Sequence, residues 1–210
     1  MLSEHKGELA FIGFAMVAYL VMASLDVSQN YVYLAVIFGL FGLIIAWKLF
    51  EGVDDESAGN EKMTEIAEAI HEGAMVFLSR EYKILGYFIG GIFLLLLFLI
   101  SMQKGVWIGF WTAISYAVGA GCSMLAGFFG MNAATTSGVR TSQAAVDGGQ
   151  SKALLIAFNG GAVMGLSVAS LGLLGVGGLF LLFGRGDSFT VVSGFAMGAS
   201  SIALLSLIHI

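Results

Sequence analysis

The sequence is poor in charged residues, lacks proline and contains a single cysteine. Asp, Glu, Lys and Arg together make up 11% of the 210 residues, whereas 58% are hydrophobic. Soluble domains usually carry about 25% charged residues, so the composition excludes an ordinary soluble domain and predicts a lipid environment. The lone Cys122 excludes an internal disulfide and fits no metal-binding motif, and we expect it to pack as a small apolar side chain.

Long apolar runs are the main feature of the chain. Crossing a hydrocarbon core of about 30 Å takes roughly 20 helical residues. Six segments reach or nearly reach this length: 9–25, 31–50, 84–102, 107–129, 154–183 and 189–210. The sequence therefore predicts an all-α, polytopic transmembrane helix bundle that forms one transmembrane domain over residues 1–210. Two longer connections remain, at 51–83 and 130–153.

The basic residues predict the orientation of this bundle. With a cytoplasmic N-terminus, seven basic residues lie inside and two outside, which follows the positive-inside rule. The first eight residues, MLSEHKGE, hold two glutamates against one lysine, which disfavours a cleaved signal peptide, so we expect 9–25 to stay as a helix. We expect a multi-pass protein of the cell (inner) membrane, with the N-terminus and both long connections in the cytoplasm. The inside set is Lys6, Lys48, Lys62, Arg80, Lys83, Arg140 and Lys152, and the outside set is Lys104 and Arg185.

One charged stretch, EIAEAIHEGAMVFLSREYKIL at 65–85, stands between the apolar runs. Apolar residues recur there at spacings of three and four, with glutamates on the other side, which predicts an amphipathic helix at the cytoplasmic interface. Arg80, Tyr82 and Lys83 would then lie at headgroup level before the third span. The apolar face consists of Met63, Ile66, Ile70, Ala74 and Phe77, and the polar face of Glu61, Glu65, Glu68 and Glu72.

Small residues recur every four positions in three of the apolar segments. Such faces allow helices to approach closely in lipid, so they predict a tight bundle. They do not distinguish a channel from a transporter or an enzyme. The three series are Ser115, Gly119, Ser123 and Gly127; Ala157, Gly161, Gly165 and Ala169; and Gly194 with Gly198.

Residues that carry chemistry are scarce. Glu68 and His71 have the Glu-x-x-His spacing of di-metal helices, but no second motif accompanies them. The stretch GGQSK at 148–152 lacks the spacing of a phosphate-binding loop, so we interpret it as a flexible loop before the fifth span. No acidic residue interrupts the apolar cores, which excludes an intramembrane ion relay within this chain. We therefore assign no catalytic, cofactor-binding or metal residue.

Three stretches together resemble the N-terminal region of the membrane-bound, ion-pumping inorganic pyrophosphatases. They are EKMTEIAEAIHEGAMVFLSREYKIL, AGFFGMNAATTSGVRTSQAA and ALLIAFNGGAVMGLSVASLGLLG, followed by the similar SGFAMGASSIAL, and they cover about residues 61–204. The resemblance implies a scaffold part of a primary pump that hydrolyses pyrophosphate in the cytoplasm and exports protons or sodium ions. It also implies a larger helix bundle, a homodimer, Mg²⁺ on the substrate and K⁺ in one subclass, with no nucleic acid partner.

The departures from the family matter equally. The aspartate-rich D-N-V-G-D motifs are absent, so the resemblance carries no catalytic residue onto this chain, and we expect the chain alone to be inactive. After SSIAL the family continues through an arginine and V-G-G-G, whereas this chain reads LSLIHI. We therefore expect a fragment whose residues 205–210 are not authentic family sequence. The alternatives are a small non-catalytic membrane protein with a structural or partner-binding role, and a secondary transporter, for which the expected inverted repeats are not found.

Overall fold

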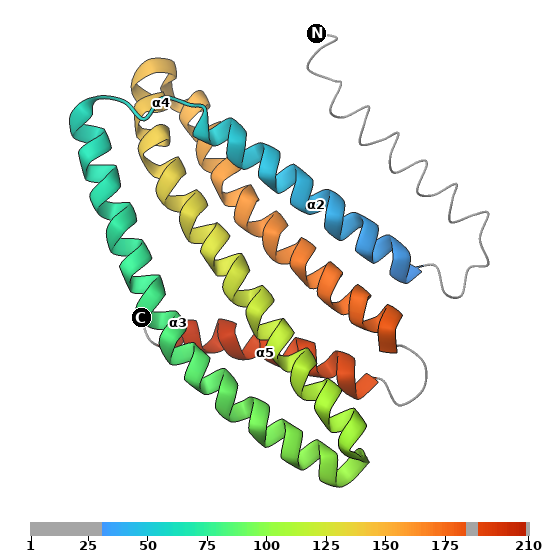
Figure 1. Cartoon of the computed structure of the whole chain (residues 1–210). Coiled ribbons are helices and arrows are strands. Elements are labelled where there is room, and N and C mark those ends of the chain that lie inside the picture. Colours follow the sequence, from blue (N-terminus) through green and yellow to red (C-terminus); the bar gives the residue numbers. More distant parts are fainter. Residues whose placement is uncertain (1–30, 184–188, 209–210) are drawn as a thin grey trace.

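The computed structural model describes residues 31–183 and 189–208, and every element in these ranges is a helix (Figure 1). The elements are α2 (Tyr31–Asp54), α3 (Glu61–Lys104), α4 (Val106–Phe183) and α5 (Phe189–Ile208). The prediction of an all-α bundle is therefore confirmed for the described residues. The predicted first span at 9–25 lies outside them.

Helix α3 is one continuous element of 44 residues. It begins at Asn60, whose side-chain oxygen accepts a hydrogen bond of 3.0 Å from the backbone N–H of Met63, as helix N-caps do. At 1.5 Å per residue it is about 66 Å long, roughly twice the thickness of a hydrocarbon core. The prediction of a separate interfacial helix before the third span is therefore wrong, because the charged stretch and that span form a single helix.

Helix α4 contains two antiparallel arms, which we call the first arm (106–148) and the second arm (150–183). Gly149 separates them with φ 71° and ψ −169°, a backbone conformation that glycine adopts readily and other residues rarely do. The prediction of a long loop over 130–153 is wrong, because helix runs on both sides of Gly149. The chain reverses within a sharp bend at the top of Figure 1.

The two arms and α2 lie side by side (Figure 1). At Gly160 a Cβ would collide with the side chain of Ser137, so glycine allows the second arm to approach the first. At Gly42 a Cβ would likewise collide with the hydroxyl of Ser170, which brings α2 against the second arm. Near the bend, Val53 of α2 is buried against apolar residues of both arms.

Helix α5 crosses the first arm at a steep angle, as the red helix in Figure 1 shows. Its backbone touches the backbone of the first arm. A Cβ added at Gly198 would collide with the carbonyl oxygen of Tyr116, and one added at Gly119 would collide with that of Phe195. At Gly194 the nearest atom to an added Cβ is the Thr112 carbonyl oxygen, at 2.6 Å. Only glycine fits at these positions without a shift of backbone.

The predicted series of small residues do not all lie in helix contacts. Gly119, Gly194 and Gly198 lie in the contact of α4 with α5, which confirms that these small residues allow close packing. The series from Ala157 to Ala169 is different, because all four members are exposed and an added Cβ at Gly161 or Gly165 would meet nothing. The prediction that this series packs within the bundle is wrong for the described residues.

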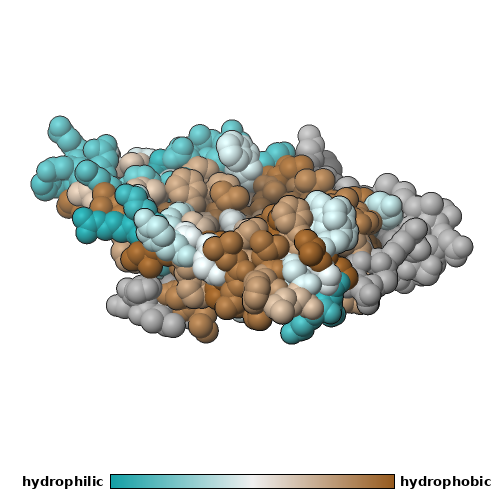
Figure 2. Space-filling model, turned by 60° about the horizontal axis from the view of Figure 1, so that its bottom comes forward, coloured by the Kyte–Doolittle hydropathy of each residue, from teal (hydrophilic) through white to brown (hydrophobic). Residues whose placement is uncertain are grey.

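The outer surface is largely apolar. Figure 2 shows hydrophobic side chains over much of the visible face and hydrophilic ones mainly towards its edges. By length and composition α2, α3 and α4 could each cross a membrane, and α5 supplies a shorter apolar stretch over Phe189–Leu205. Large apolar side chains such as Trp47 (71% exposed) and Phe158 (71%) would be costly in water. The chain is therefore an integral membrane protein.

A matched pair of substitutions tests the contact between α4 and α5. Gly119→Ala should destabilise the protein by about 1–3 kcal/mol, because a methyl group there forces two backbones apart. Gly121→Ala, two residues along the same helix, meets nothing and should be neutral or stabilising by up to about 1 kcal/mol. Unfolding of both variants in detergent would measure the difference. Equal stability of the two would contradict the backbone contact.

Candidate functional site

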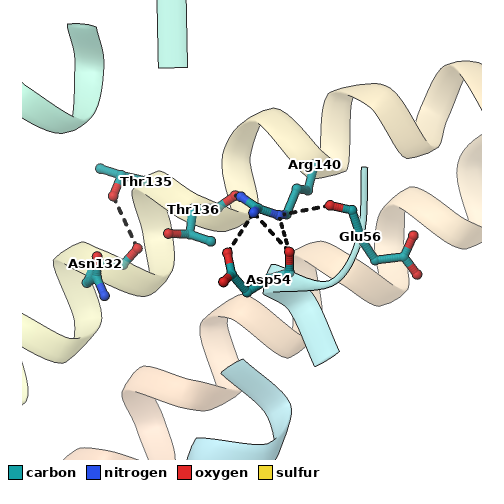
Figure 3. A network of polar contacts seen from close by, with 6 residues as sticks. All are labelled: Asp54, Glu56, Asn132, Thr135, Thr136 and Arg140. Atoms are coloured by element: carbon teal, nitrogen blue, oxygen red, sulfur yellow. Dashed lines mark hydrogen bonds and ion pairs between the residues drawn. The ribbon is translucent and has the colours of Figure 1, made fainter. Parts of the chain in front are cut away.

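A cluster of polar side chains lies where α2 ends, α3 begins and α4 bends. Helix α2 stops at Asp54, and the link 55–60 runs over the first arm of α4 to reach α3. Thr136 and Arg140 lie one turn apart on that arm, beneath the link (Figure 3). The guanidinium of Arg140 is the centre of this arrangement, and only 17% of its side chain is exposed.

The Arg140 side chain binds backbone carbonyls at the end of α2 and in the link, and it also pairs with a carboxylate (Figure 3). Its Nη2 donates to the Asp54 carboxylate at 2.6 Å and to the Asp54 carbonyl at 2.9 Å, and its Nε donates to the Glu56 carbonyl at 3.0 Å. Its Nη1 donates to the Thr136 carbonyl at 3.1 Å. Because the last carbonyls of a helix have no partner within it, Arg140 also acts as a cap for α2.

Glu56 connects the link to the second arm of α4. Its carboxylate pairs with the ammonium of Lys152 at 2.8 Å, three residues beyond the bend at Gly149. The hydrogen bond and the negative charge of Glu56 raise the pKa of Lys152 above its usual value of 10.5. Any stabilisation from this pair is therefore present at neutral pH and is lost as the pH rises above the pKa of the folded state.

A hollow of about 590 Å³ lies beside Arg140, between α3 and the first arm. His71 of α3 lines it and forms a hydrogen bond of 2.9 Å through Nδ1 with Thr135 of α4. Glu68 lines the same hollow. In residues 31–183 and 189–208, no group of three or more His, Cys, Asp and Glu side chains could hold a metal ion. The hydrogen bonds of Arg140 and His71 and the ion pair of Glu56 with Lys152 fix the helix ends to one another.

The sequence-based predictions for this region have mixed outcomes. His71 serves as a contact between α3 and α4. Ile66 and Ile70, on the predicted apolar face of α3, are 51% and 59% exposed, whereas Met63 and Ala74 of the same face are half-buried, so only part of that face packs against the described residues. Arg80 and Lys83 are exposed on α3, where their headgroup role stays a prediction. The fixing role of Arg140 was missed, because its partners are mostly backbone carbonyls 86 residues away or nearby on its own helix.

Comparison with known proteins gives consistent matches. Residues 40–208 match the family described as inorganic H+ pyrophosphatase. A K(+)-insensitive pyrophosphate-energized proton pump of Methanosarcina mazei is 40% identical over 178 residues, which are 85% of this chain and 25% of the relative. A pump of the same description from Pyrobaculum aerophilum is 44% identical over 154 residues, 73% of this chain and 21% of the relative.

Sodium pumps are also among the relatives. A K(+)-stimulated pyrophosphate-energized sodium pump of Thermotoga maritima is 34% identical over an alignment of 195 positions that covers 82% of this chain and 26% of the relative. The chain thus spans about a quarter of the length of the curated relatives that it matches. The matched region includes α3, α4, α5 and most of α2.

Replacing Arg140 tests whether it fixes the polar end. Arg140→Gln should lower the free energy of unfolding by about 2–3 kcal/mol, because hydrogen bonds from a charged group are lost and carbonyls are left unpaired. Arg140→Lys should lie between this variant and the wild type, since an ammonium cannot reproduce the planar fork of donors. Denaturant titration in detergent would measure both.

Lys62→Gln is the matched control for Arg140. Lys62 pairs with Glu65 on the surface of α3, and both side chains are about 70% exposed, so its loss should cost less than about 0.5 kcal/mol. If Arg140→Gln were as mild as Lys62→Gln, Arg140 would not fix the link.

Proposed function

Because the chain belongs to the family of inorganic H+ pyrophosphatases, we propose that it forms a membrane-embedded scaffold within a pump driven by pyrophosphate hydrolysis. The main support for this proposal is the family match over residues 40–208, together with relatives that are named as pyrophosphate-energized pumps. Proton and sodium pumps both occur among these relatives, so the proposal is cation export driven by pyrophosphate. Moving one charge against 100 mV takes about 2.3 kcal/mol, an amount that hydrolysis of one phosphoanhydride bond can supply.

The described helices suit a structural part in this pump. Arg140, Glu56 and Lys152 tie the end of α2 and the link to both arms of α4, and His71 ties α3 to the first arm, which suits a rigid frame. We propose that Mg²⁺ serves the complete pump and that K⁺ serves it if it belongs to the potassium-stimulated subclass. The described residues offer no group of metal ligands, so they do not fit a Mg²⁺ site, and the ligands would come from outside this segment.

The proposed topology has five crossings within the described residues. Helices α2, α3 and α5 and the two arms of α4 would each cross once, and the segment 9–25 would add a sixth crossing. The Gly149 bend and the link 55–60 would lie in the cytoplasm, and the turn at Gly105 would lie outside. The distribution of Lys and Arg supports this orientation in a cell membrane. The complete pump would be a homodimer.

Grafting tests the proposed function. Residues 31–204 would replace the corresponding region of the Methanosarcina mazei pump, and inverted vesicles would be assayed for Mg²⁺-dependent release of phosphate from pyrophosphate and for ion uptake. We expect activity within about tenfold of the parent, because scaffold helices of 40% identity conserve the packing that positions the chemistry. An inserted, normally accumulating but inactive graft would contradict the proposal and favour a separate, non-catalytic role.

Vesicles that contain the chain alone test whether the active site lies within this segment. The chain of 210 residues in vesicles, without the remainder of a pump, should release no phosphate above that of empty vesicles, because the described residues form no metal-ligand group. Phosphate release that requires Mg²⁺ and that follows the amount of chain would show that the active site is within this segment.

Thiol labelling tests the orientation. In a Cys122→Ser background, Gln150→Cys beside the bend should react with a membrane-impermeant maleimide in inside-out vesicles and not in intact cells. Gln103→Cys, in the last turn of α3, is the matched control and should show the opposite pattern, because both glutamines are exposed and they flank opposite ends of the first arm. The reverse result for this pair would overturn the proposed sidedness.

A further inference from the structure

An apolar groove of about 730 Å³ lies between α3, both arms of α4 and α5. Its lining includes Leu78 and Leu85 of α3, Met164 of the second arm and Ile202 of α5. Gly130 lies at the contact of the two arms, where an added Cβ would meet the Met164 side chain at 2.7 Å. The groove is therefore shaped by every described helix except α2.

One carboxylate faces this apolar groove. Glu81 of α3 is among the lining residues, and its Oε1 is buried without a hydrogen-bond partner in the described part of the chain. Its neighbour Tyr82 also lines the groove, but its hydroxyl donates to the Met124 carbonyl and so does not serve Glu81. Arg80 and Lys83 are exposed. A buried carboxylate oxygen without a donor is unfavourable, and buried charges in proteins are normally paired.

The chemistry of the groove restricts what can fill it. A lipid acyl chain matches the apolar walls but offers no hydrogen-bond donor to Glu81. A second copy of the chain placed groove to groove by two-fold symmetry would bring two Glu81 carboxylates together, which is repulsive. An apolar helix with one basic side chain satisfies both the walls and the carboxylate.

About three-quarters of the length of the relatives lies outside the matched segment, which leaves ample chain to supply such a helix. Helix α5, which is the last described element, lines the groove with Ile202 and Ala203 near its C-terminal end. We propose that the groove receives a membrane-spanning helix from the part of the pump outside the matched segment, and that a lysine or arginine of this helix pairs with Glu81. This inference rests on the proposed function only in that the chain is part of a larger pump.

Photo-crosslinking in the grafted Methanosarcina mazei pump identifies the occupant. Ala199, which lines the groove, would be replaced by p-benzoylphenylalanine, and the membranes would be irradiated before digestion and mass spectrometry. We expect an intramolecular cross-link to a helix outside the matched segment, with a lysine or arginine within one turn of the linked residue. A cross-link to a second copy, or to lipid alone, would overturn the proposal.

The natural Cys122 reports whether the groove is filled, because its thiol lines the same groove. In the graft, Glu81→Lys should raise the rate of its labelling by N-ethylmaleimide at least tenfold, since two basic groups would repel and expel the helix. Glu72→Lys is the matched control, an exposed glutamate of α3 outside the groove, and should leave the rate unchanged.

Charge exchange separates lost pairing from misfolding. Glu81→Lys combined with glutamate in place of the lysine or arginine found within one turn of the cross-linked residue should restore the protection of Cys122. Failure of this exchange, in variants that accumulate normally, would overturn the pairing. The cross-link and the labelling do not require pumping, so an inactive graft with a filled groove would contradict the proposed function while supporting this inference. An active graft whose groove contacts only lipid would do the reverse.

Discussion

Backbone contact between α4 and α5 is the constraint on which this arrangement depends. Lipid tails are as apolar as the side chains of the helices, so burial of apolar surface does little to drive helices together in a membrane. What remains is close packing, and closeness is limited by the smallest side chain at the crossing. Gly119 and Gly198 remove that limit, because each lies directly against a carbonyl of the other helix. Without them α5 would move away from the first arm, and the wall that it gives the groove would move with it.

The polar end solves a different problem from the apolar crossing. Helix ends leave carbonyls without partners, and the link between α2 and α3 has no regular structure to satisfy its own. One guanidinium supplies several donors at once, so Arg140 can hold Asp54 and Glu56 in a fixed place on the first arm. Lys152 extends the same contact to the second arm. The frame is therefore fixed by glycine contacts in its apolar part and by hydrogen bonds where it meets water.

Hydropathy and spacing were sufficient to predict the helical class, the approximate apolar segments and the use of glycine in α5. They did not predict where the helices end. Hydropathy shows which residues can lie in the hydrocarbon core, but a helix can continue into polar residues beyond it. Polar residues of 61–83 and 130–148 are compatible with helix, and so α3 and the first arm extend beyond the apolar runs. The series containing Gly161 was placed on the wrong face because Gly160 directly precedes it, and only the fold shows which of the two meets Ser137. The role of Arg140 could not be predicted, since a carbonyl acceptor leaves no mark in the sequence.

Solid-state NMR in lipid bilayers tests the backbone contact most directly. With ¹³C at tyrosine carbonyls and glycine Cα atoms, no tyrosine is directly followed by glycine in this sequence. Nearby pairs in α3, such as Gly86–Tyr87 and Tyr87–Gly90, remain in the spectrum of Gly198→Ala and are identified by that comparison. Gly119 lies one turn from Tyr116 on the same helix and provides an internal reference. The backbone contact predicts a second cross-peak, between the Tyr116 carbonyl and Gly198 Cα, that is absent in Gly198→Ala. Presence of the reference peak without the Gly198 peak would contradict it.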